Sequence, residues 1–216
     1  MVIKLQLALD LVCLDKAIEI AKKTFEFVDF LEAGTPLIKS EGIRCVKTLK
    51  ELFPENVIVA DMKTMDTGYL EVEIATKAGA DIISILGAAP DSTIAGALKA
   101  RDDYGVEVMV DLIGIKRKLE RAREMERMGV DYLVVHTGID EQQLGKSPFQ
   151  ELKEISKQVS VKLAVAGGIR PEKVPLLKDS KVDVVIVGGY ITKSSDPFKA
   201  ALEMKKALTQ LDDNST

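Results

Sequence analysis

The chain has 216 residues, and its 46% share of hydrophobic residues provides the core of one domain and excludes a disordered protein. Its 30 Lys and Arg balance 34 Asp and Glu without a block of like charge, and charges interrupt every apolar stretch, so we expect neither nucleic-acid nor membrane partners. The N-terminus lacks a signal-peptide pattern, and two Cys without metal-type spacing suit a reducing compartment, so we expect a cytoplasmic protein.

Eight short apolar runs rich in β-branched residues recur along the chain, and each precedes a segment with helical spacing. Asp15 is expected to cap the first helix, Arg117–Met128 to form a charged helix that Gly129 ends, and Pro197 to lie in the first turn of the last helix. The predicted strands are Ile3–Leu9, Phe27–Ala33, Val57–Met62, Ile82–Leu86, Glu107–Leu112, Tyr132–His136, Lys162–Ala166 and Val184–Val187.

Near-continuous apolar strands separated by helices are typical of a parallel sheet that helices cover. Eight such units in a chain of this length predict a single α/β domain, a closed (β/α)8 TIM-type barrel over residues 1–211. A doubly wound open sheet is the alternative, but no unit has the composition of an edge strand and no GxGxxG motif follows the first strand. The tail, residues 212–216, is expected to fray.

Charged residues lie where the predicted strands end, on the face that forms the active site of a barrel. Asp61 and Lys63 are two residues apart and therefore share one face of their strand. Glu32 ends the neighbouring strand, so Glu32 and Asp61 are predicted to hold a hard cation, Mg²⁺ or Mn²⁺ in its place. The structural alternative is an ion pair between Asp61 and Lys63, with Asp66 as the cap of the next helix.

His136 is the only histidine of the chain, and it ends the sixth predicted strand. This position favours a general acid or base over a merely packed residue, because imidazole titrates near neutral pH.

Two glycine pairs, Gly167-Gly168 and Gly188-Gly189, end the last two strands. Ahead of a helix N-terminus, such glycines let backbone N–H groups approach a phosphate, although tight turns alone are the other explanation. The pairs therefore predict a phosphorylated substrate.

The segment Asp61-Met62-Lys63-Thr64-Met65-Asp66 resembles the DxKxxD motif of the orotidine-monophosphate decarboxylase suprafamily. Within it, the chain is similar to the 3-hexulose-6-phosphate synthases. The resemblance covers essentially the whole chain and is most specific in residues 31–38, 60–68, 91–97, 110–115, 166–168 and 187–189.

This resemblance implies a barrel enzyme in which Glu32 and Asp61 hold Mg²⁺ and Lys63 stabilises an enediolate. His136, assisted by Asp111, would move protons. The implied reaction is the reversible aldol condensation of formaldehyde with D-ribulose 5-phosphate to D-arabino-hex-3-ulose 6-phosphate.

Three further residues receive roles from the same resemblance. Asp66 would reach across the interface of a homodimer into the partner's site, so that the two active sites are shared. Asp10 would bind substrate hydroxyls or orient the lysine of the motif, and Thr35 would bind substrate.

The sister activity of the suprafamily is 3-keto-L-gulonate-6-phosphate decarboxylase. Its pattern has Glu, Arg, Thr and Arg where this chain has Asp111, Ile139, Ala166 and Gly189, and all four departures favour the synthase. A ribulose-phosphate epimerase needs several metal-binding histidines, which one His cannot supply. A non-catalytic phosphosugar-binding subunit would lack at least one of four residues that are all present here, namely Glu32, Asp61, Lys63 and His136.

Overall fold

The computed structural model describes residues 2–213 of the chain. Eight parallel strands form a closed barrel in sequence order, because β1 pairs with β8 as well as with β2. The predicted (β/α)8 barrel is therefore confirmed, and the open sheet is excluded. The strands are β1 Lys4–Leu9, β2 Phe30–Ala33, β3 Val57–Thr64, β4 Ile82–Leu86, β5 Glu107–Asp111, β6 Tyr132–His136, β7 Lys162–Ala166 and β8 Val184–Val187.

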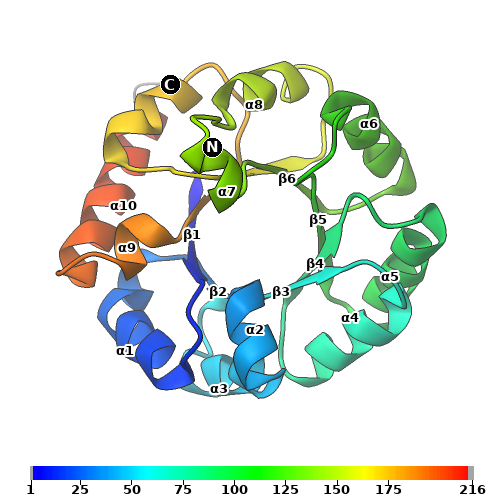
Figure 1. Cartoon of the computed structure of the whole chain (residues 1–216), viewed down its shortest axis with the longest axis horizontal. Coiled ribbons are helices and arrows are strands. Elements are labelled where there is room, and N and C mark those ends of the chain that lie inside the picture. Colours follow the sequence, from blue (N-terminus) through cyan, green and yellow to red (C-terminus); the bar gives the residue numbers. More distant parts are fainter. Residues whose placement is uncertain (1, 214–216) are drawn as a thin grey trace.

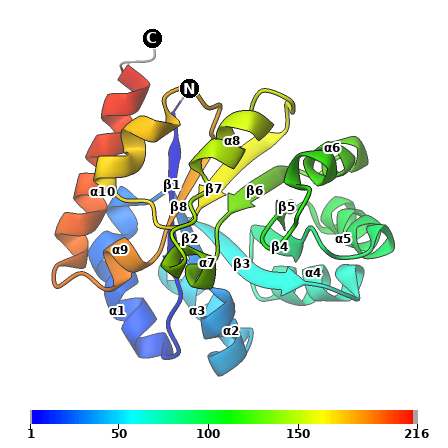
Figure 2. The ribbon, with the colours of Figure 1, turned by 45° about the horizontal axis from the view of Figure 1, so that its top comes forward.

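Helices form a ring around the strands, and the short helices α2 and α7 project over the inner side of this ring (Figure 1). The turned view shows α2, α7 and α9 at the same end of the barrel (Figure 2). Among the helices of residues 2–213, none is long and apolar enough to cross a membrane. The helices are α1 Leu14–Thr24, η1 Phe25–Phe27, α2 Thr35–Glu41, α3 Arg44–Leu52, α4 Gly68–Lys77, α5 Asp91–Tyr104, α6 Lys118–Met128, α7 Ile139–Gln143, α8 Phe149–Ile155, η2 Pro171–Leu177, α9 Gly189–Thr192 and α10 Pro197–Asp213.

Most predicted strand bounds agree with the structure within one or two residues, but two local predictions are wrong. The second strand begins three residues later than predicted, because Phe27 ends the 3-10 helix η1. Asp15 lies inside the first turn of α1, whose N-cap is Cys13. Gly129 does end α6, in the left-handed conformation with φ 83°. Of the tail predicted to fray, residues 214–216 lie outside the described part of the chain.

Alternation along the strands explains why the charged residues meet inside the barrel. Side chains two residues apart in a strand point to the same face. In five strands, an apolar side chain fills the interior of the barrel towards the N-terminal ends of the strands. The residue two positions later is polar and faces the mouth of the barrel at their C-terminal ends. The pairs are Phe30 and Glu32 in β2, Val59 and Asp61 in β3, Ile82 and Ser84 in β4, Met109 and Asp111 in β5, and Val134 and His136 in β6.

The opposite end of the barrel is held by four aspartates, each of which directly precedes an even-numbered strand. Each carboxylate accepts the backbone N–H of one residue in the preceding odd-numbered strand, at 2.7–2.9 Å. The backbone N–H of the same aspartate donates to the carbonyl of that residue. The four pairs are Asp29 with Leu5, Asp81 with Ile58, Asp131 with Val108, and Asp183 with Leu163.

Candidate active site

A cavity of about 790 Å³ lies at the C-terminal mouth of the barrel. This volume is within the range of small-molecule sites. The cavity brings together all but one of the residues predicted from the sequence. Those that line it are Asp10, Glu32, Thr35, Asp61, Lys63, Asp111, His136, Gly167, Gly168, Gly188 and Gly189.

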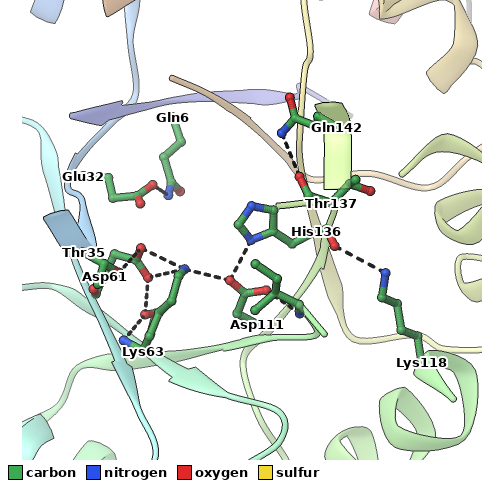
Figure 3. A network of polar contacts seen from close by, with 12 residues as sticks. Gln6, Glu32, Thr35, Asp61, Lys63, Asp111, Lys118, His136, Thr137 and Gln142 are labelled. Carbon is green, nitrogen blue, oxygen red and sulfur yellow. Dashed lines mark hydrogen bonds and ion pairs between the residues drawn. The ribbon is translucent and has the colours of Figure 1, made fainter. Parts of the chain in front are cut away.

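One carboxylate oxygen, Oδ2 of Asp111, contacts both the lysine and the histidine of the site (Figure 3). Lys63 Nζ donates to it at 2.9 Å, and His136 Nδ1 lies 2.8 Å from it. The Lys63 ammonium also donates to Oδ1 of Asp61 at 3.0 Å. Lys63 therefore lies between two carboxylates, and Asp111 lies between two groups that can carry positive charge.

These contacts decide the ionisation of two groups. Burial alone would raise the pKa of Asp111, but the hydrogen bond and charge of His136, together with the charge of Lys63, lower this pKa to about 2. Burial alone would lower the pKa of Lys63, but the charges of Asp61, Asp111 and Glu32 raise it above its ordinary value. Lys63 is therefore an ammonium near neutral pH and a poor nucleophile.

The Glu32 carboxylate is buried next to other acids. Glu32 is only 6% exposed, and Gln6 Nε2 donates to Oε2 of Glu32 at 2.5 Å. Burial, together with the charges of Asp61 and Asp10, raises the pKa of Glu32 well above its ordinary value. The charged form of Glu32 is thus costly at this place, and a cation beside the carboxylate would offset the cost.

The carboxylate oxygens of Glu32 and Asp61 suit a hard divalent ion that takes few ligands from the protein. Within residues 2–213, no group of three or more His, Cys, Asp or Glu is arranged to hold a metal ion. Two neighbouring carboxylates suit Mg²⁺, which keeps several water or substrate oxygens among its ligands. The buried Oε1 of Gln6, next to Glu32, has no hydrogen-bond partner among the described groups, so a further polar acceptor is present beside the pair.

Two hydroxyl groups fix the Asp61 carboxylate. Ser84 Oγ donates to Oδ1 of Asp61 at 2.6 Å. The Thr35 hydroxyl lies 2.7 Å from Oδ2 of Asp61 and 2.8 Å from its backbone carbonyl oxygen. Thr35, predicted to bind substrate, thus lies in the cavity wall with its hydroxyl directed to Asp61.

Asp10 lies at the end of β1, packed closely against two glycines. A Cβ atom on Gly34 would lie 2.2 Å from Oδ1 of Asp10, and one on Gly188 would lie 3.4 Å from Oδ2. Desolvation inside the mouth and the charge of Asp61 raise the pKa of Asp10. The absence of a side chain at Gly34 and at Gly188 thus leaves room for the Asp10 carboxylate at the mouth of the barrel.

The first glycine pair has a backbone that other residues rarely adopt. Gly167 has φ 122° and Gly168 has φ 64°, and a Cβ atom on Gly167 would lie 2.5 Å from the carbonyl oxygen of Thr137. The helix that follows this pair is the 3-10 helix η2, which begins at Pro171. A four-residue helix, α9, begins at Gly189. Backbone N–H groups at the glycines themselves are still the predicted phosphate donors.

Sequence reasoning missed several residues that line the cavity. Arg170 and Lys193 follow the two glycine pairs within a few residues, and both line the cavity. A cation so close to a glycine pair is a signal for phosphate binding that the sequence offers. Gln6 and Ser84 are the other omissions. No local motif indicates them, because only the fold brings them into contact with Glu32 and Asp61.

Asp66 is the one predicted site residue that does not line the cavity. It lies in a separate depression of about 370 Å³ with Gly68, Ser92 and Gly96. Its Oδ1 accepts the backbone N–H of Thr67 at 2.7 Å. Thr67 is the N-cap of α4, so the alternative of Asp66 as the cap is wrong.

Over residues 3–204 the chain matches the family described as orotidine 5'-phosphate decarboxylase / HUMPS. The chain belongs to this family. A 3-hexulose-6-phosphate synthase of Bacillus subtilis (strain 168) is 45% identical over 208 residues, which make up 96% of this chain and 99% of that protein. The predicted resemblance is therefore confirmed.

Solved structures of the family show the same barrel. The 3-hexulose-6-phosphate synthase from Salmonella typhimurium has a TM-score of 0.94 at 38% identity, and the match covers 97% of this chain and 100% of that one. KGPDC from Streptococcus mutans has a TM-score of 0.92 at 28% identity, with 98% of this chain and 99% of that one covered. The folds thus agree equally well, while sequence identity is higher to the synthase.

Proposed function

We propose that the chain is an aldehyde-lyase that joins formaldehyde to D-ribulose 5-phosphate, giving D-arabino-hex-3-ulose 6-phosphate, and that catalyses the reverse reaction. Relatives with 45% and 38% identity over nearly the whole chain are named 3-hexulose-6-phosphate synthase. The observation that supports the chemistry is the position of one Asp111 oxygen between Lys63 and His136. It provides a base and a fixed positive charge in one cavity.

His136 is the proton carrier of the proposed mechanism. An ionised carboxylate only accepts hydrogen bonds, so His136 donates through Nδ1 to Asp111, and its Nε2 is free to act as a base. Nε2 takes a proton from C1 of the pentulose phosphate, and the electrons of the C–H bond pass into an enediolate. C1 then attacks the carbon of formaldehyde, and the new alkoxide oxygen takes a proton from the imidazolium.

Lys63 balances the negative charge of the enediolate. A proton next to a carbonyl is a very weak acid near neutral pH, so the site must stabilise the transition state by several kcal/mol more than the ground state. The ammonium is fixed by Asp61 and Asp111 before the reaction, which lowers the cost of reorganisation.

Glu32 and Asp61 would hold Mg²⁺, or Mn²⁺ in its place. When bound, the ion would supply Lewis-acid polarisation of the substrate carbonyl. The burial of Glu32 beside Asp61 supports this assignment, because two adjacent carboxylates are costly without a cation.

The phosphate group of the substrate would lie at the side of the cavity where β7 and β8 end, away from Glu32 and Asp61. The backbone N–H groups of the two glycine pairs would bind it, together with the side chains of Arg170 and Lys193. Asp10 would accept hydrogen bonds from substrate hydroxyls. These contacts are remote from the reacting carbon, so they supply binding energy that orients the substrate.

We also propose a homodimer in which Asp66 of one protomer completes the site of the other. Asp66 does not line the cavity of its own chain, and the apolar side chains of Met65 and Leu70 beside it are exposed. Mixing the inactive variants Lys63→Ala and Asp66→Asn tests this. Hybrid dimers would contain one intact site, so activity should reappear; a mixture that stays inactive contradicts the shared site.

The proposed reaction is tested by the consumption of ribulose 5-phosphate that depends on formaldehyde. Turnover should stop in excess chelator and return with added Mg²⁺, and full activity in chelator would exclude the metal. If carbon dioxide is released from 3-keto-L-gulonate 6-phosphate faster than ribulose 5-phosphate is consumed with formaldehyde, the chain is instead assigned as the decarboxylase. Binding of ribulose 5-phosphate without turnover of either substrate would indicate a non-catalytic phosphosugar-binding subunit.

A further inference from the structure

Strand β3 is irregular at the point where it carries two residues of the site. It pairs with β4 through Ala60 and Ile83, and again through Thr64 and Ile85. Three residues of β3, numbers 61–63, therefore face one residue of β4, which is Ser84. A bulge of this kind redirects side chains and is frequent next to active sites.

Lys63 has a strained backbone within this bulge. Its φ is 46°, in the left-handed region, where the side chain of any residue other than glycine meets steric resistance. Such strain persists only where surrounding contacts hold it, and it is concentrated at functional sites. The contact that holds Lys63 is therefore of functional interest.

That contact is the hydroxyl group of Ser84. Ser84 Oγ accepts the backbone N–H of Lys63 at 3.0 Å and donates to Oδ1 of Asp61 at 2.6 Å. A hydroxyl has one donor and two acceptor positions, so it makes both bonds at once. The residue is only 3% exposed, so water cannot readily replace these bonds if the hydroxyl is removed.

The small size of Ser84 also matters for the path of the lysine side chain. Lys63 belongs to β3, yet its Nζ reaches Asp111 on β5 at 2.9 Å. Strand β4, with Ser84, lies between these two strands. A short side chain at this position leaves room for the lysine to pass in front of β4.

We propose that Ser84 is a positioning residue that holds the Lys63 backbone and the Asp61 carboxylate in one arrangement, so that the ammonium and the metal-binding carboxylate face the substrate carbonyl together. This inference deepens the proposed function and rests on it. Ser84 acts through its neighbours and exchanges no proton with substrate.

Three variants test the proposal. Ser84→Ala removes the hydroxyl, and Ser84→Thr retains it. Ser156→Ala is the matched control, because Ser156 is also 3% exposed but its hydroxyl donates to the Lys153 carbonyl, at the end of α8. For each variant, kcat and KM for ribulose 5-phosphate are measured, and Mn²⁺ affinity is measured by electron paramagnetic resonance without substrate.

Ser84→Ala should lower kcat by about 10- to 100-fold and weaken Mn²⁺ binding by about tenfold, with a smaller change in the KM for ribulose 5-phosphate. The proposed phosphate contacts, from which most of this KM should come, follow β7 and β8, across the barrel from β3 and β4. Ser84→Thr should recover most of both losses, and Ser156→Ala should leave both unchanged. A folded Ser84→Ala protein with wild-type kcat and Mn²⁺ affinity would overturn the proposal.

Two further outcomes separate the possible failures. If Ser84→Ala does not fold, Ser84→Cys keeps the volume with a weaker hydrogen-bonding group, and wild-type kcat in that variant would equally overturn the inference. If the wild-type protein shows no formaldehyde-dependent turnover, the proposed function fails. The Mn²⁺ affinities of the variants then still decide whether Ser84 positions Asp61.

Discussion

Nδ1 of His136 lies 2.8 Å from Oδ2 of Asp111, an oxygen that stays ionised because the pKa of this carboxyl group is lowered to about 2. The contact fixes the tautomer of the only histidine in the chain, since an ionised carboxylate accepts and cannot donate. In the neutral ring the proton therefore lies on Nδ1, and Nε2 is the nitrogen that can accept a proton. The same oxygen binds the Lys63 ammonium, so one carboxylate determines the roles of both groups.

Replacing Asp111 with Asn should remove most of the activity while the protein stays folded. The amide has no charge to hold Lys63, and its NH₂ group would favour the wrong tautomer of His136. We expect kcat to fall by roughly three to four orders of magnitude, as for other orienting carboxylates of catalytic histidines. Asp111→Glu keeps the charge and should lose less. Steady-state kinetics decide, and an Asn variant within tenfold of wild type would contradict this role.

The lowered pKa of Asp111 also predicts a pH dependence of stability. A carboxyl group whose pKa is about 2 in the folded protein, against 3.8 ordinarily, stabilises the fold fully above pH 4 and loses this contribution as pH falls towards 2. The contribution is about 2 kcal/mol, with about half of it lost at pH 3. Urea unfolding of wild type and Asp111→Asn at pH 5, 4 and 3 should show a shrinking gap, and a constant gap would contradict it.

Lys63→Met should abolish the stabilisation of the enediolate without unfolding the barrel. The variant keeps the apolar part of the side chain but leaves Asp61 and Asp111 without their shared ammonium. We expect kcat to fall by at least about a thousandfold, because an electrostatic group in a preorganised site contributes several kcal/mol. Circular dichroism serves as the folding control. Turnover near the wild-type rate would refute the assignment.

Two glycines of the proposed phosphate site should respond differently to the same substitution. Gly167→Ala places a Cβ atom 2.5 Å from the Thr137 carbonyl oxygen in a conformation with φ 122°, so we expect a loss of about 1–3 kcal/mol of stability. Gly189→Ala meets only Lys193, at 3.8 Å, which is an ordinary contact. Melting temperatures compare the two variants. Equal melting temperatures would show that the backbone at Gly167 adapts.

The sequence was sufficient for the barrel and for most of the charged cluster, because both follow from short-range periodicity. Apolar strands at regular spacing predict the fold, and a period of two brings Glu32, Asp61 and His136 to the mouth. The bulge opposite Ser84 was not predictable, since it depends on how β3 pairs with β4 and no residue type indicates that register. The expectation that Asp66 serves the partner's site came from the family resemblance alone, since its place outside the cavity of its own chain depends on the course of the chain after β3.

Asp183 should contribute to stability but not to catalysis, because it lies at the end of the barrel opposite to the cavity. Its carboxylate accepts the Leu163 N–H at 2.8 Å, and Asp183→Ala would leave this partly buried donor without that partner. We expect a loss of about 1–3 kcal/mol, or roughly 2–4 °C in melting temperature for each kcal/mol. Asp179→Ala is the matched control, since this residue makes an exposed ion pair with Lys153 that contributes little. Calorimetry and kcat are measured for both variants. The prediction is wrong if Asp183→Ala melts no lower than the control, and a loss of kcat in either folded variant would place a catalytic effect where the geometry gives none.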